Sequence, residues 1–501
     1  MIKNYIKIGI RSLLNNRVFT VVNLIGLSLG MSAALLIFLW VSNELSFDTY
    51  HNDNENLYRV ISNVDVGDEV WLWSNVPLIS VDYMKEDVDE LEEIVITRFP
   101  YGGAVVKFPS QEILNEDGFV YVSNNWFDLL KYETVDGSID DFKSTLNSIA
   151  ITKSYADQHF KDGQALGKTI EVDSAIYEVN LILKENRPNT SFQFNVIASI
   201  EPYIKNNAVR SGDYSWGNFN YDIYVRTNPN SNIAEVERKM TKIFDDNRKN
   251  NNTNITLQAL TDIRFGKEID NDHFVHRSKS SVYIFGVIGL LILITAGLNY
   301  ISLSTAMLTK RVKEIGIKKI VGASFKHIFN QLMAEATLLI FFATLCSVAV
   351  ANLFLPSLKE FTGTNLILDP GNMQFLGILA GMFLIGVLVA GIYPAILFGA
   401  FKPQHLLKTS RIPKKNISMR QVLVVIQFVI AITMLISTIV IYQQLRYIKK
   451  LDVGYDRAYV LEVIPSLFNG DWGKNLQQFD LFTKEAKKIS EFEGAAKVGG
   501  T

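Results

Sequence analysis

The sequence predicts a multi-span α-helical membrane protein with a large α+β extracytoplasmic domain inserted between the first and second transmembrane helices. Three observations support this fold class. The apolar residues, 48% of the 501, are concentrated in five long runs. Residues 44–279 instead show short alternating and helical patterns, which are typical of a water-soluble domain. Lys and Arg crowd the segments beside several runs, and such clusters mark the cytoplasmic side of a membrane protein.

The chain begins with a basic segment, residues 1–17, that contains no acid, and an uncharged run follows over residues 18–41. About 20 apolar residues suffice to cross a bilayer, so this run is long enough to span it. A cleaved signal peptide is the alternative, but its apolar part would be shorter and would end in small residues, whereas Trp40 closes this run. We expect a retained first transmembrane helix with residues 1–17 in the cytoplasm and Asn43 outside.

Residues 44–279 are expected to form one extracytoplasmic domain, large enough to bury its own core. Cys346 is the only cysteine and lies in an apolar run, so no disulfide within the chain contributes. The periodicity predicts strands at 57–64, 104–108, 118–122, 169–172, 175–183, 221–225 and 255–260, and helices at 124–130, 153–160 and 233–245.

Four further apolar runs follow this domain, and the basic segments between them fit an alternating topology. Asn271 would be outside, and Thr309 and Lys415 inside. The predicted order is transmembrane helix 282–307, cytoplasmic coupling segment 309–327, transmembrane helix 328–355, outer loop 356–372, transmembrane helix 373–398, cytoplasmic linker 401–420 and transmembrane helix 422–442. Residues 443–501, with a strand-like stretch at 459–463, would begin a second extracytoplasmic domain that is incomplete at Thr501, as in part of a longer protein.

The segment between the second and third spans is basic, KRVKEIGIKKIVGAS, and is predicted to be a short helix over 310–321. Gly322 is predicted to end this helix, and Ser324 is predicted to be the N-cap of the next one. Glu314 lies four residues before Lys318, the spacing of a helix-surface ion pair. One interpretation is a plain basic loop. The other is a helix along the membrane surface that a cytoplasmic motor protein binds.

Glycines within the spans predict close helix packing. Gly26 with Gly30, and Gly377 with Gly381, have the GxxxG spacing that lets helices approach in lipid. Near the inner end of the fourth run, Gly391, Tyr393 and Pro394 predict a kink or a helix exit. Among ionisable residues only Glu335, near the start of the third run, lies well inside a span, which argues against an ion pathway through the bilayer.

Two patterns resemble known kinds of binding site, a phosphate-binding loop and a metal site, but both interpretations are rejected. GQALGKT, residues 163–169, ends like a phosphate-binding loop, but Asp162 replaces its first Gly and the stretch leads into a predicted strand. His273 and His276 have a spacing that could hold a metal, yet no third ligand is apparent, and two half-exposed histidines near a membrane are the simpler interpretation. We expect no catalytic, cofactor or metal site in the chain, and its charge pattern implies no nucleic-acid partner.

With these residues in place, the chain resembles the permeases of the MacB/FtsX family of ABC transporters. Its coupling segment is similar to the REIG…VGA motif of the family through Glu314, Ile315, Gly316, Ile317, Val321, Gly322 and Ala323, with Gln331 and Glu335 continuing it. The fourth run is similar to the family's G-x-YPA…P exit through Gly391, Ile392, Tyr393, Pro394, Ala395 and Pro403. Phe160 and the stretch Gly167, Lys168, Thr169 and Ile170 resemble the FG…PIGKTI stretch of the outer domain, which accounts for the apparent phosphate-binding loop.

The sequence departs from the family pattern in two respects. Lys161 follows Phe160 where the family has Gly, and Ala165 and Leu166 replace the usual Pro-Ile. A fifth span is also present where the best-known members have four, which suggests a duplicated arrangement with a second permease half, in this polypeptide or in another chain.

The resemblance implies an extracytoplasmic MacB-like domain at 44–279 and an FtsX-like domain at 282–400, in a bacterial inner membrane. It implies that a separate cytoplasmic ATPase, which binds the ATP, docks on Arg311, Glu314, Ile315, Gly316, Lys318, Val321, Gly322 and Ala323. Motion would pass to the outer domain for export or extraction of a peptide, toxin, drug or lipoprotein, with a periplasmic adaptor or outer-membrane channel as further partners. The alternative is a membrane sensor or cell-wall regulator that signals through its outer domain.

Overall fold

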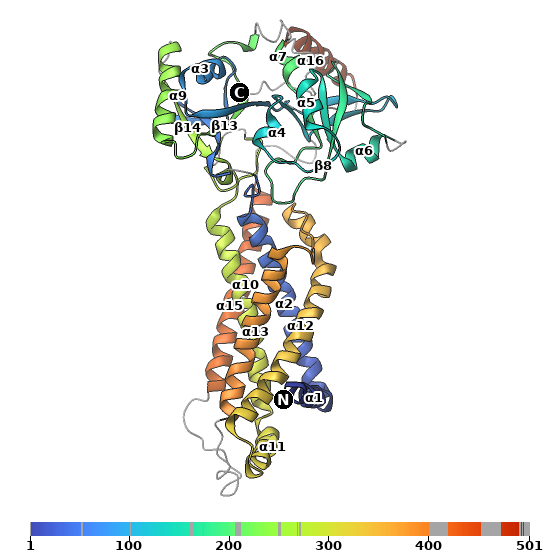
Figure 1. Cartoon of the computed structure of the whole chain (residues 1–501), viewed down its shortest axis with the longest axis vertical. Coiled ribbons are helices and arrows are strands. Elements are labelled where there is room, and N and C mark those ends of the chain that lie inside the picture. Colours follow the sequence, from blue (N-terminus) through green and yellow to red (C-terminus); the bar gives the residue numbers. More distant parts are fainter. Residues whose placement is uncertain are drawn as a thin grey trace. The chain divides into compact units, whose positions relative to one another are not determined.

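The computed structural model describes residues 2–51, 54–100, 102–160, 164–173, 175–205, 212–248, 252–267, 269, 272–399, 419–451, 472–489, 492 and 494. These residues fall into two compact units (Figure 1). The first contains residues 1–45 and 278–460 and is helical, and the second contains residues 46–277 and 461–501 and holds the sheet. We call them the membrane unit and the outer domain.

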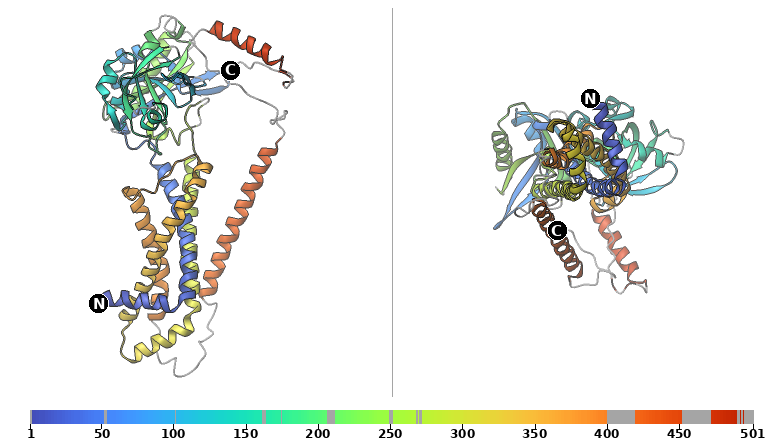
Figure 2. Two further views of the ribbon diagram at one scale, coloured as in Figure 1. Left: turned by 90° about the vertical axis from the view of Figure 1, so that its right-hand side faces the viewer. Right: turned by 90° about the horizontal axis from the view of Figure 1, so that it is seen from below.

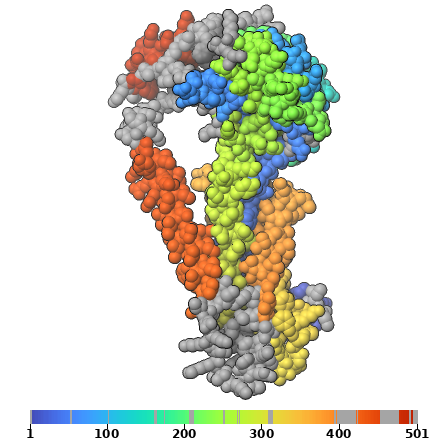
Figure 3. All heavy atoms as spheres, turned by 90° about the vertical axis from the view of Figure 1, so that its left-hand side faces the viewer, coloured from blue at the N-terminus to red at the C-terminus, as the bar shows by residue number. Residues whose placement is uncertain are grey.

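The membrane unit contains five helices that are long and apolar enough to cross a bilayer among the residues the structure describes. They are α2 (Arg17–Leu45), α10 (Lys279–Ala306), α12 (Phe325–Thr362), α13 (Met373–Gly399) and α15 (Met419–Lys450). The first four share one apolar core, to which Met31, Leu293 and Ile340 contribute. Helix α15 contacts α10, stands apart from the other helices along the rest of its length (Figures 2 and 3), and keeps most of its apolar side chains exposed.

Two shorter helices complete this unit. α1 (Ile2–Asn15) runs across the same end of the spans as α11 (Leu308–Ile320) (Figure 2). Exposed Ile6, Ile10 and Leu14 on α1, together with its basic residues, are typical of a helix that lies in a membrane interface. The sequence predicted a basic segment at residues 1–17 but no helix there, so α1 was not predicted.

The third span is longer than predicted, because α12 continues through Pro356 to Thr362. The proline costs one backbone hydrogen bond but does not end the helix. The helix ends at Gly363, which has a left-handed φ of 71° and donates its N–H to Lys359 O at 2.8 Å. The predicted loop at 356–372 is therefore partly wrong, since its first seven residues are helical.

Among the described residues, one of the two predicted glycine pairs lies against a neighbouring helix. A Cβ added at Gly30 would lie 2.6 Å from Ala296 Cβ, and one at Gly26 3.3 Å from Asn299, so α2 and α10 approach closely at both positions. At Gly377 and Gly381 an added Cβ would meet no described atom within 4 Å.

On α13, the close contact with α12 occurs instead at Gly391, where an added Cβ would lie 3.0 Å from Met333 Sδ. The helix also continues past this glycine to Gly399, so of the two alternatives, a kink or a helix exit, the structure has no exit at Gly391. Tyr393 and Pro394 lie within α13, and their side chains are outside the described part of the chain.

The outer domain is built on one sheet in the order β14-β1-β13-β4-β7-β12-β9-β11-β10-β5-β6, with β2 paired to β1, β3 to β13 and β8 to β11. Most pairs are antiparallel, but β7–β12 and β9–β11 are parallel. The strands are β1 (Leu57–Val66), β2 (Glu69–Trp73), β3 (Asn75–Pro77), β4 (Leu91–Arg98), β5 (Ala104–Lys107), β6 (Ile113–Glu116), β7 (Phe119–Val122), β8 (Thr134–Gly137), β9 (Ser148–Thr152), β10 (Thr169–Val172), β11 (Ala175–Leu183), β12 (Val196–Ser199), β13 (Phe219–Thr227) and β14 (Thr253–Ala259).

Helices cover both faces of this sheet. Along β4, Ile94 and Ile96 join one apolar cluster and Val95 joins the other, as the alternation of side chains in a strand requires. The first cluster lies under α3 and α9, which contact each other (Figure 1), and the second under α4 and α5. The helices are α3 (Ser80–Asp87), α4 (Trp126–Leu129), α5 (Ile139–Ser144), α6 (Lys153–His159), α7 (Glu201–Lys205), α9 (Ile233–Asn247) and α16 (Trp472–Ala486), with one-turn helices η1 (Asn54–Asn56) and η2 (Leu260–Asp262).

All seven strands and all three helices predicted for the outer domain are present, with ends that differ by up to two residues. Seven strands were not predicted: β2, β3, β4, β6, β8, β9 and β12. Of these, β9, β12 and the centre of β4 are buried on both faces and show no polar alternation. The predicted strand at 459–463, Lys415 and most of the linker at 401–420 lie outside the described residues, as does Asn271.

Candidate functional site

The segment 308–324 forms the short helix that the sequence predicted. Helix α11 ends at Ile320, and the N–H of Gly322 and of Ala323 bond back to Lys319 O at 3.0 Å and Lys318 O at 2.9 Å. This pair of bonds closes a Schellman motif, which needs the left-handed φ of 102° at Gly322. Ser324 then caps α12 by accepting the N–H of His327. The predicted helix, its end at Gly322 and the N-cap at Ser324 are therefore present, and binding of a motor protein to this helix stays a prediction.

One face of α11 is packed against the membrane unit. Ile315 is buried and contacts a small cluster formed by Ile328 and Leu332 of α12 and Ala395 of α13. Gly316 beside it is also buried, and Ala323 is half-buried against the same cluster. Helix α11 therefore packs against the first turns of α12 and the last turns of α13.

A chain of hydrogen bonds joins the surface of α11 to the interior of α12. Lys318 Nζ donates to Glu314 Oε1 at 2.6 Å and to Gln331 Oε1 at 3.1 Å. Gln331 Nε2 in turn donates to Oε1 of Glu335, whose side chain is buried. The Glu314–Lys318 pair was predicted. Its extension to Gln331 was not, because it depends on how α12 folds back beside α11.

Helix α1 contacts α12 at the same level. A Cβ added at Gly9 would lie 2.8 Å from Leu338 Cδ1 and 3.7 Å from the backbone of Glu335. The N-terminal helix and the coupling helix therefore both bear on the stretch of α12 around Glu335.

The other face of α11 is apolar and exposed. Ile317, Ile320 and Val321 are 64%, 66% and 83% exposed, and the side chain of Glu314 beside them is 61% exposed. Gathered apolar side chains on a surface mark an interaction site. Sequence reasoning selected Glu314 and Val321 as contact residues but neither Ile317 nor Ile320, although the spacing of 317, 320 and 321 indicates one helix face. Arg311 lies in α11, with its side chain outside the described part of the chain.

The patterns that resembled chemistry in the outer domain have structural roles. Lys168 and Thr169 lead into β10, which pairs antiparallel with β11, so this turn has no helix N-terminus to hold a phosphate. His276 Nε2 lies 2.7 Å from Asp272 Oδ2, whereas the ring of His273 stacks on Phe99 at 4.2 Å. The two rings have separate partners, and no group of three potential metal ligands converges among the described residues.

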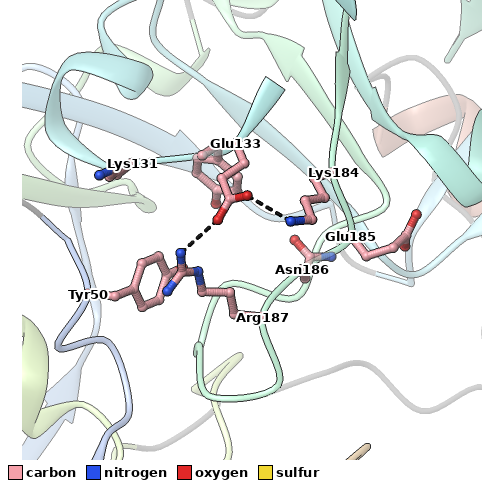
Figure 4. Close-up of a pocket in the computed structure, with 8 residues that line it drawn as sticks. Tyr50, Lys131, Glu133, Lys184, Glu185, Asn186 and Arg187 are labelled. Carbon is pink, nitrogen blue, oxygen red and sulfur yellow. Dashed lines mark hydrogen bonds and ion pairs between the residues drawn. The ribbon is translucent and has the colours of Figure 1, made fainter. Parts of the chain in front are cut away.

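A shallow pocket in the outer domain is lined by Tyr50, Lys131, Tyr132, Glu133, Lys184, Glu185, Asn186 and Arg187 (Figure 4). Glu133 accepts from Lys184 at 2.9 Å and from Arg187 at 2.7 Å, and the Arg187 guanidinium lies 4.6 Å from the centre of the Tyr50 ring. Burial raises the pKa of Tyr50 to about 12. The Glu133 carboxylate is thus shared by two cations, and the Tyr50 phenol stays protonated near neutral pH.

Two family models match the chain. A MacB-like periplasmic core domain matches residues 20–243, and an FtsX-like permease C-terminal domain matches residues 286–403. The macrolide export ATP-binding/permease protein MacB of Neisseria meningitidis is 24% identical over 290 residues, which are 55% of this chain and 40% of that protein. An uncharacterized ABC transporter permease of Bacillus subtilis, YvrN, is 20% identical over 356 residues, which are 67% of this chain and 83% of that one.

Among solved structures, the periplasmic region of MacB from Actinobacillus actinomycetemcomitans aligns with 40% of this chain and 89% of its own, at 12% identity and a TM-score of 0.30. The chain spans 40% of the length of the Neisseria relative. Together the two family models cover well over half of the sequence, and they match it in the order in which the outer domain and the later spans occur. The chain therefore belongs to the MacB/FtsX family of ABC transporter permeases.

Proposed function

We propose that this chain is a permease subunit that passes the ATP-driven motion of a separate cytoplasmic ATPase to its outer domain, for export or extraction of a peptide, toxin, drug or lipoprotein. The observation that carries the proposal is the two-faced coupling helix α11. Its exposed apolar face, with Glu314, would bind the ATPase, and its buried face rests on α12 and α13. Motion of the ATPase would reach the spans through Ile315 and through the hydrogen bonds from Lys318 to Glu335.

The proposal places α1 and α11 in the cytoplasm and the outer domain in the periplasm of a bacterial inner membrane. Excess Lys and Arg in residues 1–17 and beside α11 supports this orientation. Labelling with an impermeant thiol reagent tests it, with Asn43→Cys and Thr309→Cys placed in a Cys346→Ser background, because Cys346 is exposed. Asn43→Cys should react from outside and Thr309→Cys only after lysis. External labelling at position 309 contradicts the orientation.

Purification of the protein from its own cells in mild detergent tests the ATPase contact. An ATP-binding subunit should accompany the wild type and be lost with Ile317→Ser or Glu314→Lys, because the first removes exposed apolar surface and the second reverses the acid beside it. Leu353→Ser is the matched control, since Leu353 is 75% exposed on α12 but lies far along that helix from α11.

Each outcome of this purification decides between two functions. Retention of the subunit by both α11 variants contradicts docking on this face. Repeated absence of any ATP-binding subunit from the wild type favours the alternative, a sensor or cell-wall regulator that signals through its outer domain. The experiment gives its answer whether or not a periplasmic adaptor or an outer-membrane channel also binds the protein.

A further inference from the structure

Two short segments connect the outer domain to the first two spans. Residues 46–51 follow α2, and residues 272–277 precede α10. We call them the first and second connectors. These segments are the covalent links through which α2 and α10 can act on the outer domain, so their contacts bear on how the domain responds.

The first connector is fixed to the loop between β11 and β12. The Asp48 carboxylate accepts from Thr190 Oγ1 at 2.7 Å and from the Ser191 N–H at 2.9 Å. Asp48 N–H donates to Asn189 O at 2.9 Å, and Asn189 Nδ2 donates to Ser46 O at 2.9 Å. Asp48 itself is buried and holds a left-handed φ of 55°, a strained conformation that these bonds maintain.

The second connector is fixed to the other end of the sheet. Arg59 of β1 donates from two nitrogens to the two oxygens of Asp272, both at 2.8 Å, and also binds Gln258 of β14. His276 lies 2.7 Å from the same carboxylate. Strands β1 and β14 form one edge region of the sheet, whereas β11 and β12 lie beyond β13, β4 and β7 in the strand order. The polar contacts of the two connectors are thus separate, while the ring of Phe274 in the second connector also packs on Phe192 of the β11–β12 loop, with centroids 5.3 Å apart.

Arg264 contacts both connectors. Its guanidinium carbon lies 4.2 Å from the centre of the Phe47 ring in the first connector, and its Nη1 donates to Val275 O in the second at 2.9 Å. Its own carbonyl accepts the N–H of Arg277 at 2.8 Å. Arg264 and Phe47 are both buried. A planar guanidinium is suited to this position, because it can stack on a ring and donate at its edge at the same time.

We propose that Arg264 is a positioning residue that holds the two connectors together, so that motion of α2 and α10 enters the outer domain as one movement. The source of the motion in this inference rests on the proposed function. The link that Arg264 makes between the two connectors, which we call the clamp, does not depend on it. Without Arg264, the polar contacts of the two connectors would lead to different parts of the domain, the β11–β12 loop and β1, and the ring packing of Phe274 on Phe192 would remain between them.

Hydrogen exchange on the full-length protein in nanodiscs tests the clamp without any ATPase. Phe47→Leu removes the ring under Arg264 from the first connector. This substitution should nevertheless make hydrogen exchange in the second connector, residues 272–277, about tenfold faster. A tenfold change corresponds to about 1.4 kcal/mol in the free energy of local opening. Arg264→Gln should speed exchange in both connectors. Faster exchange confined to the first connector in Phe47→Leu overturns the clamp.

Arg238→Gln serves as the matched control, because Arg238 is a largely exposed arginine of α9 that pairs with nearby Glu235. It should leave both connectors unchanged. If Arg264→Gln does not fold, as judged by its thermal transition, Phe47→Leu still decides the question, since Leu keeps most of the buried apolar volume.

The link to function is tested by adding the co-purified ATPase and a non-hydrolysable ATP analogue. In the wild type, exchange should change in α11 and in both connectors. In Arg264→Gln the change at α11 should remain, while that in one connector falls by at least half. If both connectors of Arg264→Gln respond to the nucleotide as strongly as those of the wild type, Arg264 has no role in transmitting the motion. No nucleotide response in α11 of the wild type contradicts the proposed function instead, and the ATPase-free measurement then decides whether the clamp exists.

Discussion

The coupling helix and the two connectors use charge in opposite ways. On α11 the Glu314–Lys318 pair is partly exposed and lies beside exposed apolar side chains. At the second connector, the Arg59 and Asp272 side chains are 0% and 2% exposed. An exposed pair contributes a few tenths of a kcal/mol and is readily exchanged for a partner's contacts, whereas breaking a buried pair leaves an unsatisfied charge. The difference indicates that α11 is suited to bind and release a partner, and that the connectors are suited to hold their contacts.

The electrostatics of the connectors agree with this division. Burial alone would raise the pKa of Asp272, but hydrogen bonds and charge from Arg59, with help from His276, outweigh it and leave the pKa lowered. Burial raises the pKa of Asp48 despite its hydrogen bonds to Ser191 and Thr190. Asp272 is therefore held as a carboxylate by a cation, whereas Asp48 relies first on the neutral donors Ser191 and Thr190, with a smaller contribution from the charge of Arg264.

The largest expected effect is at the buried pair. Arg59→Met should destabilise the outer domain by about 3–5 kcal/mol, because the Asp272 carboxylate would stay buried without its cation. Urea unfolding followed by tryptophan fluorescence measures this. Lys107→Met is the control: the Lys107–Glu171 pair at 3.5 Å is about 40% exposed, so its loss should cost less than about 1 kcal/mol. Equal effects of the two substitutions would erase the distinction between buried and exposed charge.

A second prediction concerns Asp222, a fully buried carboxyl near Arg59. Burial raises its pKa to about 7, although Arg59 lowers it. A folded-state pKa above the ordinary value favours the protonated form, so this contribution to stability is present below about pH 4 and is lost as pH rises towards 7. Asp222→Asn should therefore raise the free energy of unfolding, relative to wild type, by roughly 2–4 kcal/mol more at pH 8 than at pH 4.

Urea titrations of both proteins at the two pH values check this difference. The lowered pKa of Asp272 acts in the opposite sense, since its stabilisation is lost as pH falls, but it is common to both proteins and cancels in the comparison. A difference that does not change with pH would show that Asp222 is already ionised in the folded protein.

Helix packing in the membrane unit gives a third, smaller effect. Gly30→Val should destabilise the unit by about 1–3 kcal/mol, because a Cβ at this position collides with Ala296 of α10. Gly377→Val is the matched control, since an added Cβ there meets no described atom. Thermal unfolding in detergent compares the two. A cost at Gly377 as large as that at Gly30 would point to a further partner on α13.

The smallest effect is expected at the end of α11. Gly322→Ala should cost about 1 kcal/mol, because an L-residue with a side chain is strained at a φ of 102°. The change should appear as faster hydrogen exchange at residues 318–323, where the Schellman bonds form, with global stability nearly unchanged. Gly381→Ala, in mid-helix and open space, should not destabilise. Unaltered exchange around Gly322 would mean that the motif contributes little to holding α11.

The sequence alone predicted those parts of the fold that depend on local patterns. The spans follow from run length, the end of α11 from Gly322, the N-cap from Ser324, and the Glu314–Lys318 pair from its spacing. A local signal was outweighed at Pro356, which α12 passes through. The GxxxG spacing of Gly377 and Gly381 has no neighbour within 4 Å among the described atoms. A spacing motif indicates which residues share a face but not whether another helix lies against it.

The candidate site divides in the same way. Its residues could be chosen from sequence because they lie within one helix and one motif, and the family resemblance added to that choice. The bond from Lys318 to Gln331, the packing of Ile315 on Ala395, and the position of Arg264 between Phe47 and Val275 could not be predicted. These partners are 13, 80, 217 and 11 residues apart along the chain. Local sequence determines periodicity, caps and charge, whereas contacts between distant segments exist only once the chain has folded, and here those contacts decide which elements can move together.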